Sequence, residues 1–105
     1  MEWALRRRSW VEERFTRCLQ HLSELALATG SHPEVQEATN LALEIDSANQ
    51  EIHLLKMKSF LASGKPEAAI RHFEKTERHL RQEYELEPSI ELLKLYQMAR
   101  YGLPV

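Results

Sequence analysis

Five histidines are the residues of this chain whose type suits metal binding or proton transfer. His72 and His79 are seven residues apart, which places them two turns apart on one face of a helix. That separation is too large for one ion without a third ligand between them. The chain also has neither a His-Glu-x-x-His pattern nor the paired cysteines of common zinc sites. The spacing therefore predicts no metal site.

Nucleophilic and acid–base chemistry are not predicted either. The single cysteine, Cys18, has no nearby group that would activate a thiol, and we expect it to be a small buried core residue. The adjacent carboxylates Glu12 and Glu13 are typical of a solvent-exposed helix face. No glycine-rich phosphate-binding loop occurs in the sequence. We therefore expect no catalytic residue, no cofactor and no enzyme. A small helical enzyme or metal protein remains the third alternative.

A basic cluster near the N-terminus is the one feature that suits nucleic acid. Arg6, Arg7 and Arg8 lie between Trp3 and Trp10, and arginine beside an aromatic ring can bind a phosphate and stack on a base. However, the net charge of the chain is −2, whereas a phosphate-binding surface usually shows a basic excess. We interpret the cluster as a basic helix end and expect no direct DNA binding.

The elements that position these residues follow from an internal repeat. Ala28-Thr29-Gly30 recurs as Ala62-Ser63-Gly64, a shift of 34 residues, and each copy precedes a proline-led helical segment. This period is typical of tetratricopeptide repeats, in which helix pairs stack to bury a shared core. The sequence thus predicts an all-α, tetratricopeptide-like α-solenoid. It would consist of about two helix–turn–helix repeats and a C-terminal capping helix, in a single domain over residues 1–105.

Apolar spacing and capping signals set the expected helix bounds. The predicted helices run from Trp3 or Ser9 to Thr29, and over Ser31–Asp46, Asn49–Ser63, Pro66–Tyr84 and Pro88–Tyr101. Gly30 and Gly64 are expected to end helices, and Ser31 with Glu34 to form a capping box. The apolar residues of the first helix recur every three or four positions, which predicts that they face the core. These residues are Val11, Phe15, Cys18, Leu22, Leu25 and Ala26.

With the helices placed, the residue order resembles the bacterial transcriptional activator domain, a tetratricopeptide-like module of antibiotic-regulatory-protein-type regulators. The most specific stretch is Leu80-Arg81-Gln82-Glu83-Tyr84-Glu85-Leu86-Glu87-Pro88-Ser89, where the family has an L-x-x-E-L-G-x-E-P-S block. Glu85 replaces the family glycine, which predicts an extended turn or a continuous helix there. The resemblance also implies a winged-helix DNA-binding domain, which this chain lacks. The chain would be an excised domain, or its DNA contacts would lie in a partner chain.

The resemblance implies a non-catalytic regulatory module of a transcriptional activator that mediates self-association or contacts transcription machinery or other domains of the same regulator. The first alternative is a stand-alone tetratricopeptide-type adaptor. We expect the partner to bind a groove lined by the first helix of each pair, with Phe60 and Met57 as its main contacts. The candidate groove residues are Gln20, Ser23, Glu24, Leu27, His53, Lys56, Met57 and Phe60.

Association and location complete the predictions. Exposed apolar ends at Trp3, Trp10 and residues 103–105 suggest a homodimer. No apolar run is long enough to cross a membrane, and no apolar segment of a signal peptide follows the arginines. A single cysteine cannot form an internal disulfide, which fits a reducing compartment. We therefore expect a cytoplasmic protein without a membrane partner.

Overall fold

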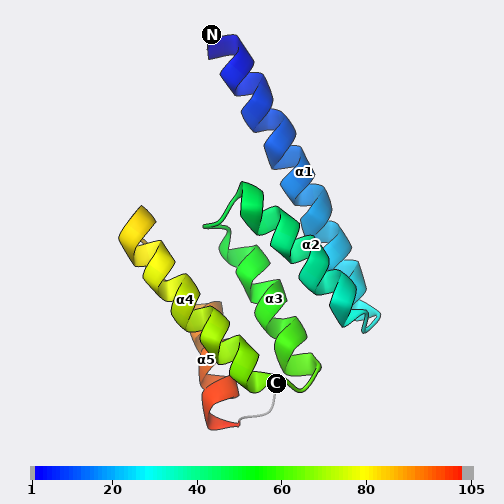
Figure 1. The fold of residues 1–105 in the computed structure, drawn as a ribbon, viewed down its shortest axis with the longest axis vertical. Coiled ribbons are helices and arrows are strands. Elements are labelled where there is room, and N and C mark those ends of the chain that lie inside the picture. Colours follow the sequence, from blue (N-terminus) through cyan, green and yellow to red (C-terminus); the bar gives the residue numbers. More distant parts are fainter. Residues whose placement is uncertain (1, 103–105) are drawn as a thin grey trace.

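The computed structural model describes the backbone of residues 2–102 and the side chains of residues 10–102. Within these residues the chain forms five α-helices (Figure 1). They are α1 (Glu2–Ala28), α2 (His32–Ile45), α3 (Gln50–Ala62), α4 (Pro66–Tyr84) and α5 (Ile90–Tyr101). The all-helical class is confirmed, and the first helix begins near Trp3 rather than at Ser9.

The helices stack in chain order, each antiparallel to the previous one, and α3 packs against all four others. The molecule is elongated, with extents of 51 × 33 × 17 Å. Figure 1 shows that the N-terminal half of α1 extends beyond the other helices. This is the tetratricopeptide-like arrangement of two helix pairs, with α5 packed on the second pair.

Glycine ends the first helix of both pairs. Gly30 and Gly64 adopt φ values of +77° and +76°, a left-handed conformation that side chains with a Cβ resist. The expected capping box at Ser31 is wrong, because its side chain makes no cap hydrogen bond. Side-chain caps occur instead at Asn49, whose oxygen accepts from the Ile52 N–H, and at Ser89, which accepts from the Leu92 N–H.

The segment between α4 and α5 begins with a residue in the left-handed conformation, for which glycine is best suited. Glu85 adopts φ 53° and ψ 37° and is the C-cap of α4. The Leu86 N–H then donates to the Leu80 carbonyl at 3.0 Å, which closes the helix end. Of the two predicted alternatives the continuous helix is therefore wrong, since α4 ends in a left-handed residue although that residue is not glycine. Residues 85–89 form a non-helical connection between α4 and α5, in agreement with the extended turn.

Two apolar clusters form the core. The first joins Leu19 of α1 to α2 and α3, and the second joins α3, α4 and α5. In the second cluster the Phe73 ring stacks on Tyr96, with ring centroids 4.3 Å apart. Burial of Leu92 and Leu95 against this cluster gives α5 its capping role.

The orientation predicted for α1 is wrong. Its apolar stripe, Cys18 included, lies on the exposed face, and the buried residues are Thr16, Leu19 and Ser23. The two hydroxyls are buried because each donates to a carbonyl of its own helix, Thr16 to Glu12 at 2.9 Å and Ser23 to Leu19 at 2.8 Å. Small, internally bonded side chains let α2 approach α1 closely at little desolvation cost.

Candidate functional site

The first helices of the two pairs and the capping helix lie along one side of the stack and form a groove. Both α1 and α5 contact α3. The groove between them has a volume of about 720 Å³. Its lining residues come from α1, α3, α5 and the α5 N-cap: Gln20, Glu24, Leu27, Ala28, Gln50, Glu51, Leu54, Leu55, Lys58, Ser89 and Glu91.

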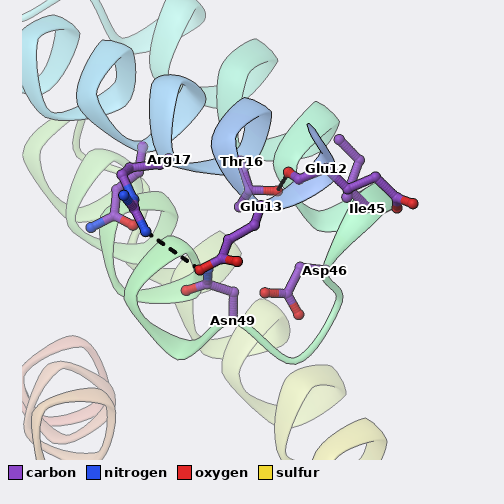
Figure 2. A pocket seen from close by; sticks show the side chains of 8 residues that line it. Glu12, Glu13, Thr16, Arg17, Ile45, Asp46 and Asn49 are labelled. Carbon is purple, nitrogen blue, oxygen red and sulfur yellow. Dashed lines mark hydrogen bonds and ion pairs between the residues drawn. The ribbon is translucent and has the colours of Figure 1, made fainter. Parts of the chain in front are cut away.

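A second hollow of about 430 Å³ continues this side of the molecule toward the α2–α3 turn (Figure 2). Gln20 lines both spaces. Figure 2 shows Glu13 and Arg17 of α1 facing Asp46 and Asn49 of the turn, with a contact of 3.4 Å between Arg17 and Glu13. Together the two hollows extend along α1 from Glu12 to Ala28.

The chemical character of this continuous groove is acidic. Its basic lining residues are Arg17 and Lys58, and one of them is already paired with a carboxylate. Its acidic lining residues are Glu12, Glu13, Glu24, Asp46, Glu51 and Glu91. Such a surface attracts a cationic segment, and the partly buried Leu27 and Leu54 offer apolar contact beneath the charges.

Gln20 organises the middle of the groove. Its side-chain amide donates to the Glu24 carboxylate at 3.2 Å and to the Glu51 carboxylate at 2.7 Å. One side chain of α1 thereby holds two carboxylates from different helices close together. Two neighbouring negative charges are a good receptor for a guanidinium or ammonium group.

The groove contains some of the predicted binding residues and not others. Gln20 and Leu27 line it, together with Glu24. Ser23 and Met57 do not, because both side chains are fully buried with 0% exposure. His53, at 5% exposure, is buried on the opposite side of α3, where Lys56 also lies. The expectation that His53, Lys56 and Met57 line the groove is therefore wrong.

Phe60 also lies away from the groove. Its ring contacts His72 of α4, with centroids 6.4 Å apart, and the Lys56 ammonium lies 5.5 Å from its centre. The α3 residues that line the groove are instead Gln50, Glu51, Leu54, Leu55 and Lys58. The apolar side chains of α3 point to all sides of the helix, so its apolar pattern alone does not show which side faces the groove. The signal that could have found this side is the row of positions 51, 54 and 58 at helical spacing.

The opposite side of α3 carries a histidine network in a pocket of about 360 Å³. His53 Nε2 donates to the Ser47 carbonyl at 2.8 Å, so in the neutral ring Nδ1 accepts from His72 Nε2, 2.9 Å away. Thr76 lies 3.3 Å from both rings, and His79 contacts the Ser47 hydroxyl at 3.0 Å. These bonds tie the α2–α3 turn to α4.

The two histidines that contact each other in this network, His53 and His72, are held neutral. Burial, with smaller effects from His53, Lys56 and Lys75, lowers the pKa of His72 to about 3. Burial also lowers the pKa of His53, against the opposing effect of its bond to Ser47. Among residues whose positions are described, no group of three or more His, Cys, Asp or Glu side chains could hold a metal ion. The network is a structural link between helices.

The basic cluster at Arg6, Arg7 and Arg8 lies within α1, but its side chains are outside the described residues. The side chain of Trp3 and residues 103–105, on which the homodimer prediction rests, are outside them as well. Trp10 is described and exposed, and the Arg14 guanidinium lies 4.8 Å from its ring. No helix within the described part of the chain is long and apolar enough to cross a membrane.

The stacked helix pairs and their groove define a helical-repeat protein. The sequence model of the bacterial transcriptional activator domain matches residues 1–100, nearly the whole chain. The chain therefore belongs to the bacterial transcriptional activator domain family, which is a regulatory family. No curated protein and no solved structure matches it. Its general role is thus that of a module related to transcriptional activators.

Proposed function

We propose that this chain is a non-catalytic protein-interaction module of a transcriptional activator, and that it binds a cationic segment of a partner in the acidic groove. The partner is part of the transcription machinery or another domain of the regulator. The observation that carries the proposal is the convergence of Glu24 and Glu51 from two helices on Gln20. We also propose that residues 1–105 act as one module, with the DNA contacts made elsewhere in the regulator.

The groove suits a peptide or helix better than a small molecule. It is open, long and continuous over two hollows, whereas small-molecule sites are enclosed. Its exposed carboxylates raise the rate and specificity of association, while Leu27 and Leu54 offer area for burial. An amphipathic segment with lysine or arginine on one side and an apolar residue on the other matches this arrangement.

A tethered reporter tests this proposal. The chain is fused to an unrelated DNA-binding domain whose operator lies upstream of a bacterial promoter. We expect the fusion to raise transcription, and the Glu24→Lys/Glu51→Lys variant to lose most of the increase. The control is Glu74→Lys/Glu83→Lys, which changes the net charge equally at exposed positions of α4 outside the groove.

The outcomes separate the possible roles. Activation that is lost only in the groove variant supports the proposal. Equal loss in the control variant would show that net charge matters and the groove does not. A correctly folded fusion that never activates contradicts a role in contacting transcription machinery, and leaves another domain of the regulator or the partner of a stand-alone adaptor as the segment that binds the groove.

A further inference from the structure

The pocket that contains the histidine network lies between two helices that do not pack against each other. Figure 1 shows α3 between α2 and α4, and among the described helices these two contact α3 and not one another. The pocket therefore has α3 as its floor and α2 and α4 as its walls. Its volume of about 360 Å³ lies within the range of small-molecule sites, which begins at about 300 Å³.

Lysines outnumber carboxylates in this pocket. Lys56 belongs to the α3 floor and Lys75 to the α4 wall, whereas Glu44 of α2 is the one carboxylate among the described lining residues. Neither lysine forms an ion pair with a described carboxylate. His53 and His72 are neutral at pH 7 and add no charge. The two sides of α3 thus differ in charge, because the groove is acidic and this pocket carries an excess of positive charge.

Neutral groups hold Lys56 in place. Its ammonium donates to the side-chain oxygen of Gln36 at 2.7 Å and to that of Asn40 at 2.5 Å. Both acceptors are amides, so these bonds fix the ammonium without neutralising it, and they leave one of its three N–H groups for another acceptor. Burial, followed by the charge of Lys75, lowers the pKa of Lys56, as expected for neighbouring cations without an anion between them.

Three helices each supply one hydrogen-bond donor to the pocket. The side-chain oxygen of Asn40 accepts from Lys56, so its amide N–H groups are available, and the ammonium of Lys75 is exposed. A phosphate monoester offers three terminal oxygens and a charge of about −2, whereas a carboxylate offers two oxygens and a single charge. The described lining also has no arginine, the residue that pairs best with the two oxygens of a carboxylate. The donors and the charge therefore suit phosphate.

We propose that this pocket binds the phosphate group of a small phosphorylated compound, with Asn40, Lys56 and Lys75 as its contacts. The organic part of the compound lies against the half-buried Leu43. The histidine network ties the α2–α3 turn to α4 and so holds the wall that carries Lys75 in place. Because α2 belongs to the first helix pair and α4 to the second, the ligand joins the two pairs. The site does not rest on partner binding in the acidic groove.

A nuclear magnetic resonance titration at low ionic strength and pH 7 tests the site, with inorganic phosphate and ribose 5-phosphate as probes. We expect both to bind, and ribose, which lacks the phosphate, not to bind. Lys56→Gln and Lys75→Gln should each raise the dissociation constant about tenfold, because each removes one contact between opposite charges. Lys75 is exposed, so its variant keeps the test valid if Lys56→Gln does not fold.

Lys58→Gln is the matched control. Lys58 is on the same helix as Lys56 but lines the acidic groove, so its loss should leave phosphate affinity unchanged. Glu44→Gln removes the carboxylate of the pocket and should lower the dissociation constant about threefold. Phosphate should shift the backbone amide signals of Lys56 and Lys75, with little change at Glu51 in the groove.

The outcomes decide the proposal and the source of the phosphate. Tighter binding of ribose 5-phosphate than of inorganic phosphate supports an organic ligand, and the reverse would overturn that part and leave the free ion as the ligand. No binding of either probe, equal binding of succinate, or an equal loss in Lys58→Gln would overturn the proposal.

The titration and the reporter are independent. Glu24→Lys/Glu51→Lys should leave phosphate affinity unchanged, because both positions line the groove on the other side of α3. A chain that binds no phosphate and still activates the reporter would overturn the phosphate site alone. A chain that binds phosphate and never activates would contradict only the contact with transcription machinery.

Discussion

The two helix pairs follow one pattern in sequence and differ in what surrounds them. In the second pair, α3 lies between α1, α2, α4 and α5, so residues on nearly every side of it are buried. In the first pair, α1 packs on α2 and α3 along one side, and its apolar stripe is exposed. Burial in a helical stack is therefore set by the neighbours of a helix as much as by its own apolar pattern.

The two pairs should differ most in how much stability they lose when a charged side chain replaces an apolar one. Met57→Glu places a carboxylate where the side chain has no exposure, and we expect a loss of about 3–5 kcal/mol in the free energy of unfolding. Leu25→Glu, on the bare stripe of the first pair, should change the stability of the monomer little. Urea unfolding at low protein concentration measures both. Similar losses would show that the stripe of α1 is buried in the monomer.

The histidine network should make stability depend on pH through the second pair. His72 has a pKa of about 3 when folded and 6.5 as the ordinary value, so between these values the unfolded chain binds more protons. Stability is then complete above pH 6.5 and falls as the pH is lowered. For His72 the loss is at most about 2 kcal/mol at pH 5.

Chemical unfolding at pH 7.5 and pH 5 measures this loss. His72→Gln should reduce the pH dependence, because it removes the buried ring whose pKa is lowered. An unchanged slope in His72→Gln would contradict the assignment of a neutral buried ring.

The glycines that end α1 and α3 should respond alike. Gly64→Val should cost about 1–2 kcal/mol, because a β-branched side chain resists the left-handed conformation. Gly30→Val should cost a similar amount, because at both glycines no atom lies within 4 Å of the place a Cβ would take, so no clash is added. Thermal unfolding compares the two. Unchanged melting of Gly64→Val would show that the helix end adapts.

The smallest expected effect is a gain at Glu85. Its left-handed conformation costs about 1–2 kcal/mol, while glycine adds about 0.5–1 kcal/mol of backbone entropy, so Glu85→Gly should stabilise by roughly 0.5–1 kcal/mol. Differential scanning calorimetry resolves such a shift. Glu83→Gly, in the last turn of α4, should instead destabilise. A loss of stability in Glu85→Gly would show that the side chain contributes more than the strain.

The sequence predicts the elements better than their orientation. The repeat of Ala-Thr/Ser-Gly and the prolines that follow it are local signals, and the helix ends they predict agree with the structure. The inward orientation expected for the stripe of α1 rests on the rule that apolar faces usually pack inward. Its exposure depends on the absence of a helix before α1 among the described residues, and no local pattern of α1 carries that information.

The groove shows the same limit. The positions of Gln20 and Leu27 are predictable because α1 has one polar row beside its buried row. The choice of Met57 and His53 on α3 is wrong, because a helix that is apolar on all sides has no pattern that indicates its outer face. Burial of a histidine also requires partners for both ring nitrogens. The two partners of His53 are the Ser47 carbonyl in the turn before α3 and the His72 ring on α4. The sequence of α3 alone does not show either partner.

Site-specific photo-crosslinking shows directly whether partners bind the groove side of α3. A photoreactive amino acid replaces Lys58, which is exposed in the groove, or Arg78, which is exposed on α4. In the bacterial cell we predict crosslinks from position 58 to a lysine- or arginine-containing segment of the transcription machinery or of a regulator. Crosslinks to such a partner from position 78, with none from position 58, would contradict the claim.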